Sequence, residues 1–121
     1  MKGGAVFRSG NFIIIARRGT IMQIPCSKIL LIKKEQQQTV IVTNNDNGYG
    51  HIVCYCSLKH IHEILNDEKF IYEHRSFIFN IDHIACMHDR MILIDDGSPV
   101  FLGKNSFYRI MKYFMAARMS E

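Results

Sequence analysis

The sequence of 121 residues contains no apolar run long enough to cross a membrane and only four cysteines. Its longest apolar runs, such as Phe12 to Ala16 and Met91 to Ile94, have the length of strands, whereas a spanning helix needs roughly 18 apolar residues. Near the N-terminus Arg8 breaks a short apolar run, so no secretory signal is predicted. Four cysteines in a chain that is 48% hydrophobic do not form the framework of a small secreted protein. We therefore expect a cytoplasmic protein with reduced thiols.

The motifs of common catalytic sites are also absent. The sequence has no nucleophile elbow, no HExxH motif and no phosphate-binding loop. His88 and Asp89 are adjacent, but the turn on which they lie favours exposed polar surface over a catalytic pair. We therefore predict that the chain is not an enzyme and requires no cofactor.

Spacing likewise predicts no metal site. The paired CxxC knuckles of structural zinc sites are missing. Cys54 and Cys56 would share one face of a strand, whereas His60 and His62, two residues apart on a helix, would not share a face. The simpler interpretation is that Cys26, Cys54 and Cys86 are small core residues, with a redox pair among them left open.

Positive charge exceeds negative charge modestly, and it is concentrated near turns. The formal net charge is +4 and the pI is about 9.0, which favours a polyanionic partner without requiring one. Acidic residues fall mostly in the segments 63–73 and 95–96. The basic residues that lie in or beside predicted turns are Arg17, Arg18, Lys28, Lys33, Lys34, Arg75, Arg90 and Lys104.

Hydrophobic patterning predicts a single domain, residues 1–121, with many short strands and two helices. Ser57 is a suitable N-cap for a helix that ends at Asn66, and Asn105 or Ser106 for a C-terminal helix. The inward residues of the second helix would be Phe107, Ile110, Met111, Phe114 and Met115. Strands are expected at 5–7, 12–16, 21–24, 29–32, 39–43, 51–56, 70–72, 77–80, 85–87, 91–94 and 100–102. This pattern predicts a mostly-β, sandwich-like or barrel-like domain.

The segment 70–84 is the most informative part of the chain. Most of it has the composition of a core strand with apolar residues on both faces, yet His74, Arg75 and Ser76 interrupt it together. A strand that buries both faces does not carry three hydrogen-bond donors at its centre, so we expect the chain to reach the surface there. Because Arg75 is always cationic, that surface suits an anion.

The same segment resembles a known family. The pattern Phe70-x-x-x-His74-Arg75-Ser76-Phe77-Ile78-x-Asn80-Ile81-x-x-Ile84 is similar to the signature of LytTR-type DNA-binding domains, the output domains of many bacterial response regulators. Weaker blocks follow the family's order at 24–32, 57–70 and 95–104, so the resemblance covers about Asn11 to Phe114. It implies an elongated, mostly-β fold with one short central helix and a C-terminal helix. Such domains present loops, not a recognition helix, to duplex DNA.

The resemblance also implies which residues contact DNA. Three loops, at 33–39, 74–76 and 104–106, would enter successive major grooves and supply the base contacts. Arg75 and Lys104 are the first candidates, together with Gln38 or Thr39, and an extra residue in the third loop leaves Asn105 as an alternative to Lys104. The residues implied to hold phosphate are His74, Ser76, Arg90, Lys33 and Lys34. Lys33 departs from the family, which often has an acidic residue there. Asn80 is expected to have a structural role.

Each candidate also has an interpretation without DNA. Arg75 would pair with Glu73 or Asp82, residues 36–38 would form only a polar turn, and Asn105 would cap a helix. His74 would be a buried histidine bonded to a carbonyl.

The alternative function is a small β-domain that binds single-stranded RNA or a protein partner. Binding of a single strand uses exposed aromatics among basic residues. The candidates Tyr49, Tyr55, Tyr72 and Tyr108 fall mostly at positions expected in the core or on strand faces. For a LytTR-like domain we instead expect direct-repeat sites in duplex DNA, pairing of two copies on the DNA, and no membrane. A receiver domain does not fit in this length, so the chain is either a fragment of a longer regulator or a stand-alone version.

Overall fold

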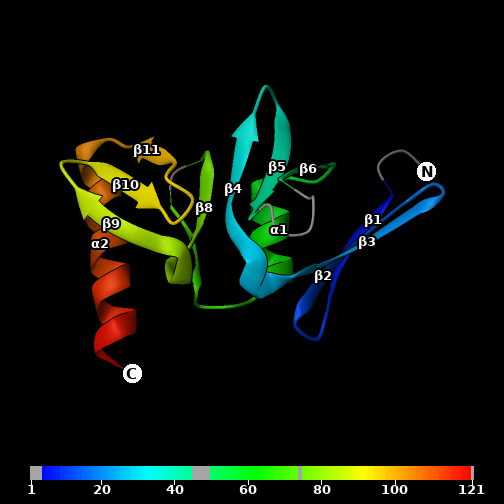
Figure 1. Ribbon diagram of the computed structural model, residues 1–121, viewed down its shortest axis with the longest axis horizontal. Helices are drawn as coiled ribbons and strands as arrows, with labels where there is room; N and C mark the ends of the chain where they lie inside the picture. The colour runs from blue at the N-terminus through cyan, green and yellow to red at the C-terminus, as the bar shows by residue number, and fades with distance from the viewer. Residues whose placement is uncertain (1–3, 45–49, 74, 121) are drawn as a thin grey trace.

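The computed structural model describes residues 4–44, 50–73 and 75–120, which form three antiparallel sheets and two α-helices (Figure 1). The first sheet contains β1 (Ala5–Ser9), β2 (Phe12–Arg17) and β3 (Thr20–Pro25). The central sheet has the strand order β6-β5-β4-β8-β7 and contains β4 (Ile29–Glu35), β5 (Gln38–Thr43), β6 (His51–Cys54), β7 (Phe70–Tyr72) and β8 (Phe77–Asn80). The last sheet contains β9 (Ile84–His88), β10 (Met91–Ile94) and β11 (Pro99–Phe101). Short 3₁₀ turns, Cys26–Lys28 and Ile81–His83, link neighbouring sheets.

The two α-helices differ in place and length. α1 (Leu58–Leu65) lies between β6 and β7 in the chain, and α2 (Lys104–Met119) ends the described chain. The three sheets lie side by side along the longest axis, with α2 beside the last sheet (Figure 1). The prediction of a mostly-β, elongated fold with a short central helix and a C-terminal helix is therefore confirmed. The described strands form three separate sheets, and the first and last pack against the two faces of the central one.

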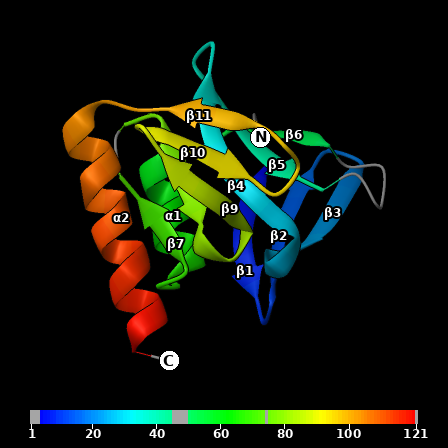
Figure 2. The same cartoon turned by 60° about the vertical axis from the view of Figure 1, so that its left-hand side comes forward.

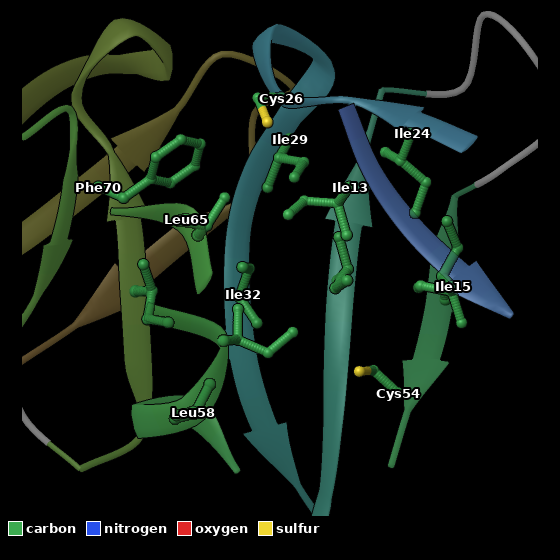
Figure 3. Packing of buried hydrophobic residues seen from close by; sticks show 14 residues of the cluster. Ile13, Ile15, Ile24, Cys26, Ile29, Ile32, Cys54, Leu58, Leu65 and Phe70 are labelled. Carbon is green, nitrogen blue, oxygen red and sulfur yellow. The ribbon is translucent and has the colours of Figure 1, made fainter. Parts of the chain in front are cut away.

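The central sheet is buried on both faces, which explains its continuous apolar strands. Ile32, Ile41 and Ile78 are neighbours in register and point into a core shared with α1 and the first sheet (Figure 3). On the other face Val42 and Phe79 join a second core, with β9–β11 and α2. A strand between two covered faces needs apolar residues at successive positions, because its side chains alternate between the faces.

α1 begins and ends as the sequence predicts. The Ser57 side chain accepts a hydrogen bond from the backbone N–H of His60 at 3.1 Å, and Asn66 ends the helix in the left-handed conformation. Its buried residues, Leu58, Ile61 and Leu65, recur on one face.

The expected start of α2 was wrong. Gly103 occupies the N-cap position and makes no side-chain bond, so neither Asn105 nor Ser106 caps the helix. Ser106 is buried inside the first turn. Met115, expected to face inward, is 50% exposed.

Candidate nucleic-acid interface

The first predicted loop is shorter and more regular than the sequence suggests. β4 continues to Glu35 and β5 begins at Gln38, so the turn consists of Gln36 and Gln37 alone. Their φ angles are 49° and 67°, which is the geometry of a two-residue hairpin turn that normally favours Asn and Gly. Residue type did not predict this turn, because glutamine rarely occupies it. A strand hairpin therefore carries Lys34 and Gln38 toward its tip.

The second loop, between β7 and β8, is bonded to this hairpin. The backbone N–H of Lys34 donates to the carbonyl oxygen of Ser76 at 2.9 Å, which continues the pairing of Lys33 with Phe77 by one step. Arg75 lies in the turn just before Ser76 and is exposed. The candidate His74 lies outside the described residues.

Other cations occupy the two carboxylates that might have paired with Arg75. Glu73 accepts from Arg109 of α2 at 2.6 Å, and Asp82 contacts both Arg118 (2.9 Å) and Lys69 (3.1 Å). Within residues 4–44, 50–73 and 75–120, the side chain of Arg75 makes no ion pair or hydrogen bond. Its guanidinium fork therefore has no acceptor among the described residues.

A surface hollow of about 650 Å³ joins the first two loops. Its lining includes Lys34, Gln38 and Arg75, and it extends to Lys59 near the start of α1. No described residue of this lining carries a carboxylate. A concave surface with several cations and no acid attracts a polyanion.

Neighbouring candidates in the first loop have different freedom. Lys33 and Lys34 point to opposite faces of β4, and the ammonium of Lys33 lies 2.8 Å from the carboxylate of Glu35. That contact holds the pKa of Glu35 below its ordinary value. Lys34 is exposed and lines the hollow. The charge of Lys34 is therefore less neutralised than that of Lys33.

Thr39 is poorly placed for contact with DNA. It is only 6% exposed, and its hydroxyl donates to the carbonyl oxygen of Cys56 at 2.6 Å. Gln38, the preceding residue, is exposed. Of this pair the structure therefore leaves Gln38 free to reach a base.

The third loop and the β9–β10 turn form a second unit. Lys104 and Asn105 are exposed in the first turn of α2, and Arg90 is exposed in the β9–β10 turn with φ 65°. The backbone N–H of Leu102 donates to the carbonyl oxygen of Arg90 at 3.0 Å, which fixes this turn beside the start of α2. Arg90 and Lys104 line a second hollow, of about 740 Å³, which also holds Asp89.

These loops lie along one edge of the molecule. In Figure 1 the β4–β5 turn, the start of β8, the β9–β10 turn and the start of α2 all lie in the upper part of the view, and the rotated view in Figure 2 agrees. The described candidate loops thus share one edge of the structure. In the chain, 42 residues separate Lys33 from Arg75, and 29 separate Arg75 from Lys104.

A third hollow lies elsewhere and has the opposite charge. It measures about 900 Å³ and lies between α1 and the end of α2; its lining of described residues includes Glu63, Asp67 and Glu68 but no lysine or arginine. A surface of this sign repels phosphate, so size alone does not identify a DNA site. The part of α2 that lines this hollow is residues 113–120. Figure 1 shows the C-terminal end of α2 at the bottom of the view, away from the basic edge.

Asn80 is buried and bonds only within the fold. Its side-chain Nδ2 donates to the carbonyl oxygen of Ile29 at 2.8 Å, and its Oδ1 accepts from the backbone N–H of Asp82 at 3.0 Å. The amide therefore joins the start of β4 to the turn that follows β8.

Two aromatic residues that were expected in the core or on strand faces are exposed. Tyr55 is 61% exposed and lies in the first hollow, and Tyr108 is 54% exposed and lies in the second. The guanidinium of Arg17 stacks over the Tyr55 ring, 5.1 Å from its centre. Residue type and strand period gave no signal for this exposure, because the strand ends at Cys54 and not at Cys56.

Residues 4–44, 50–73 and 75–120 also bear on metal binding and on membrane spanning. No group of three or more His, Cys, Asp or Glu side chains comes together there as a metal site. Neither described α-helix has the length and apolar character needed to cross a bilayer.

A protein family and a solved structure both match this chain. Curated proteins give no match. Among solved structures, the chain is similar to the LytTr DNA-binding domain of a protein from Bacillus cereus described as a methyl-accepting/DNA response regulator. The TM-score is 0.71 at 19% identity, over 87% of this chain and 97% of that one, so the two share a fold. The family model for the LytTr DNA-binding domain matches residues 19–115. The chain therefore belongs to the LytTr family of DNA-binding domains.

Proposed function

We propose that this domain reads duplex DNA sequence-specifically in bacterial transcription regulation, through the loops of its basic edge. The family binds DNA in regulation and is not a family of enzymes, which supports a role in DNA binding. One observation supports sequence-specific reading by the loops. Arg75 is exposed, has no ion-pair partner among the described residues, and shares a basic hollow with Lys34 and Gln38.

Residue chemistry assigns different roles along this edge. A guanidinium fork bridges the O6 and N7 atoms of guanine, and a glutamine or asparagine amide bridges N6 and N7 of adenine. Arg75 would read one base in the major groove and Gln38 another. At the third loop Lys104 or Asn105 would read the next groove.

Phosphate contacts would position the edge on the duplex. Lys34 and Arg90 have the exposed charge for this role, while Lys33 shares its charge with Glu35. Ser76 would contribute its hydroxyl, and His74 is proposed from the family pattern alone. Two copies of the domain would bind direct repeats side by side.

Selection of bound duplexes from a randomised pool tests this function. The wild type and Arg75→Ala would be selected in parallel, with Lys112→Ala as a control that removes an equal charge from exposed helix surface away from the hollows. We expect a sharp motif for the wild type and for Lys112→Ala, and loss of preference at one position with Arg75→Ala. No enrichment by folded wild-type domain would contradict the proposal.

Exposure of Tyr55 and Tyr108 supports a second candidate, the binding of single-stranded RNA. Each ring lies beside cations, as in stacking sites for single strands. One face of Tyr55 is already covered by Arg17, which weakens this alternative. Competition between a duplex and an unpaired strand of the same sequence separates the two candidates, since only a stacking site prefers the unpaired strand.

A further inference from the structure

Two thiols lie in direct contact beside the first hollow. The sulfur atoms of Cys54 and Cys56 are 3.2 Å apart. β6 ends at Cys54, and the chain then bends through Tyr55, which turns Cys56 back toward its neighbour. Both cysteines are free thiols. The Cys54 side chain is 2% exposed and belongs to the buried cluster that includes α1 (Figure 3), yet it lines the first hollow, and Cys56 is partly exposed.

The surroundings make the two sulfurs unequal. The hydrogen bond between the two sulfurs, with a second from the Cys56 backbone N–H, lowers the pKa of Cys54 below its ordinary value although burial opposes it. The same bond, with burial, raises the pKa of Cys56. Arg17 adds positive charge near Cys54, and its Nε and one terminal nitrogen are buried without a hydrogen-bond partner among the described residues. Cys54 is thus the thiol of the pair that loses its proton first.

The thiol pair is bonded to the β4–β5 hairpin, which carries part of the proposed DNA surface. Cys54 and Cys56 line the same hollow as Gln38 and Arg75. Cys54 is the register partner of Thr39 in β5, and the Thr39 hydroxyl donates to the Cys56 carbonyl at 2.6 Å. A movement of Cys56 therefore acts on Thr39, the residue next to Gln38.

We propose that Cys54 and Cys56 form a redox-active dithiol that a hydroperoxide converts into a disulfide, and that this closure distorts the first hollow. The Cys54 thiolate attacks the terminal oxygen of the peroxide and, with one proton, gives a sulfenic acid and an alcohol, or water from hydrogen peroxide. The Cys56 sulfur then attacks the Cys54 sulfur, and the Cys56 proton and the sulfenic hydroxyl leave as water. The two thiols lose two electrons, and the peroxide gains them.

Closure of the disulfide requires a local rearrangement. A disulfide bond is about 2.0 Å long, so the sulfurs must approach each other by roughly 1 Å from their present contact. The bend at Tyr55 and Cys56 must tighten, which strains the bond between Thr39 and the Cys56 carbonyl. The effect on DNA rests on the proposed function, whereas formation of the disulfide does not.

Oxidation of the whole chain by hydrogen peroxide tests the chemistry directly. The Cys86→Ser variant is used because Cys86 is exposed and would form cross-links between copies. We expect an intact mass lower by two hydrogens, a peptide with Cys54 and Cys56 joined, and reversal by dithiothreitol. Cys26 does not line the first hollow, and burial raises the pKa of its thiol, so it serves as an internal control that stays reduced.

Single serine variants then test the roles of the two sulfurs. In Cys56→Ser the sulfenic acid at Cys54 has no resolving thiol and should be trapped by dimedone. Cys54→Ser should give no such adduct. An adduct on Cys54→Ser alone would overturn the assignment, and absence of the disulfide in the peroxide-treated parent would overturn the proposal.

DNA affinity of the reduced and oxidised forms tests the coupling. We expect the disulfide to weaken duplex binding by about tenfold, the loss of roughly one good polar contact, and dithiothreitol to restore it. Equal affinity of both forms would overturn the coupling. If the reduced protein does not bind duplex DNA, the proposed function fails, while the mass measurement still decides whether the dithiol is redox-active.

Discussion

The backbone N–H of Lys34 donates to the carbonyl oxygen of Ser76 at 2.9 Å. This bond extends the β4–β8 ladder into the loop that carries Arg75. The loop is therefore held by the central sheet, which is buried on both faces, and not only by its own turn. A contact surface that is already ordered loses less conformational entropy when it binds.

Replacement of Arg75 by alanine should weaken binding to the preferred duplex by about 1–3 kcal/mol and relax one base position. Arg75→Lys keeps the charge but loses the planar fork, so it should retain non-specific affinity and lose the base preference. Fluorescence titration against the preferred site and single-base variants measures both. A lysine variant with unchanged discrimination would show that Arg75 contacts phosphate only.

The two lysines of β4 should behave differently. Lys34→Ala should weaken binding to all duplexes similarly and reduce the slope of log affinity against log salt by about 1, because it removes one exposed phosphate contact. Lys33→Ala should have a smaller effect, because Glu35 already neutralises much of its charge. Titrations over a series of salt concentrations give the slopes, and equal slopes for the two variants would contradict this ranking.

Replacement of Gln36-Gln37 by Asn-Gly should stabilise the domain. Both glutamines have positive φ, which costs an ordinary residue roughly 1 kcal/mol, whereas asparagine and glycine suit this turn. We expect the free energy of unfolding in urea to rise by about 1 kcal/mol, after part of the gain is lost to the flexibility of glycine in the unfolded chain. A decrease would show that the glutamine side chains stabilise the turn in another way.

Asn80→Ala should destabilise the domain by about 2–3 kcal/mol, because the buried carbonyl of Ile29 loses its donor and the N–H of Asp82 its acceptor. The matched control is Asn105→Ala, which changes an exposed asparagine and should alter stability by less than about 0.5 kcal/mol. Urea unfolding measures both. DNA affinity should also distinguish the two variants, because Asn105→Ala weakens binding if the Asn105 amide reads a base.

Stability should fall in acid partly through Asp82. Burial disfavours the charge of this carboxylate, but hydrogen bonds and charges from Arg118 and Lys69 outweigh burial and hold its pKa below the ordinary 3.8. A carboxyl whose pKa is lowered by folding stabilises the native state above the unfolded pKa and loses that contribution as pH falls through the folded one. Asp82→Asn should therefore lower stability at neutral pH and flatten the decline below about pH 4. Parallel curves for wild type and variant would contradict this.

Much of the architecture is determined by the sequence alone. Strand and helix positions follow from local patterns, since period-two or continuous apolar runs fit pleated strands and Ser57 to Asn66 carries both helix caps. The interruption at Arg75 correctly marked a surface loop, because polar donors do not fit a strand that is buried on both faces. The hairpin turn at Gln36-Gln37, the end of β6 at Cys54, the cap of α2 and the exposure of Met115 differ from what their residue types predict.

The tertiary structure alone decides which candidate side chains are free. Arg109 and Arg118 of α2 pair with Glu73 and Asp82, and this leaves Arg75 without an ion pair among the described residues. Thr39, in contrast, is turned inward onto the Cys56 carbonyl, although its neighbour Gln38 is exposed. These partners lie 17 to 36 residues apart in the chain. Local sequence patterns report the period of an element, whereas pairing across such distances depends on how the packed sheets and helices bring charges together.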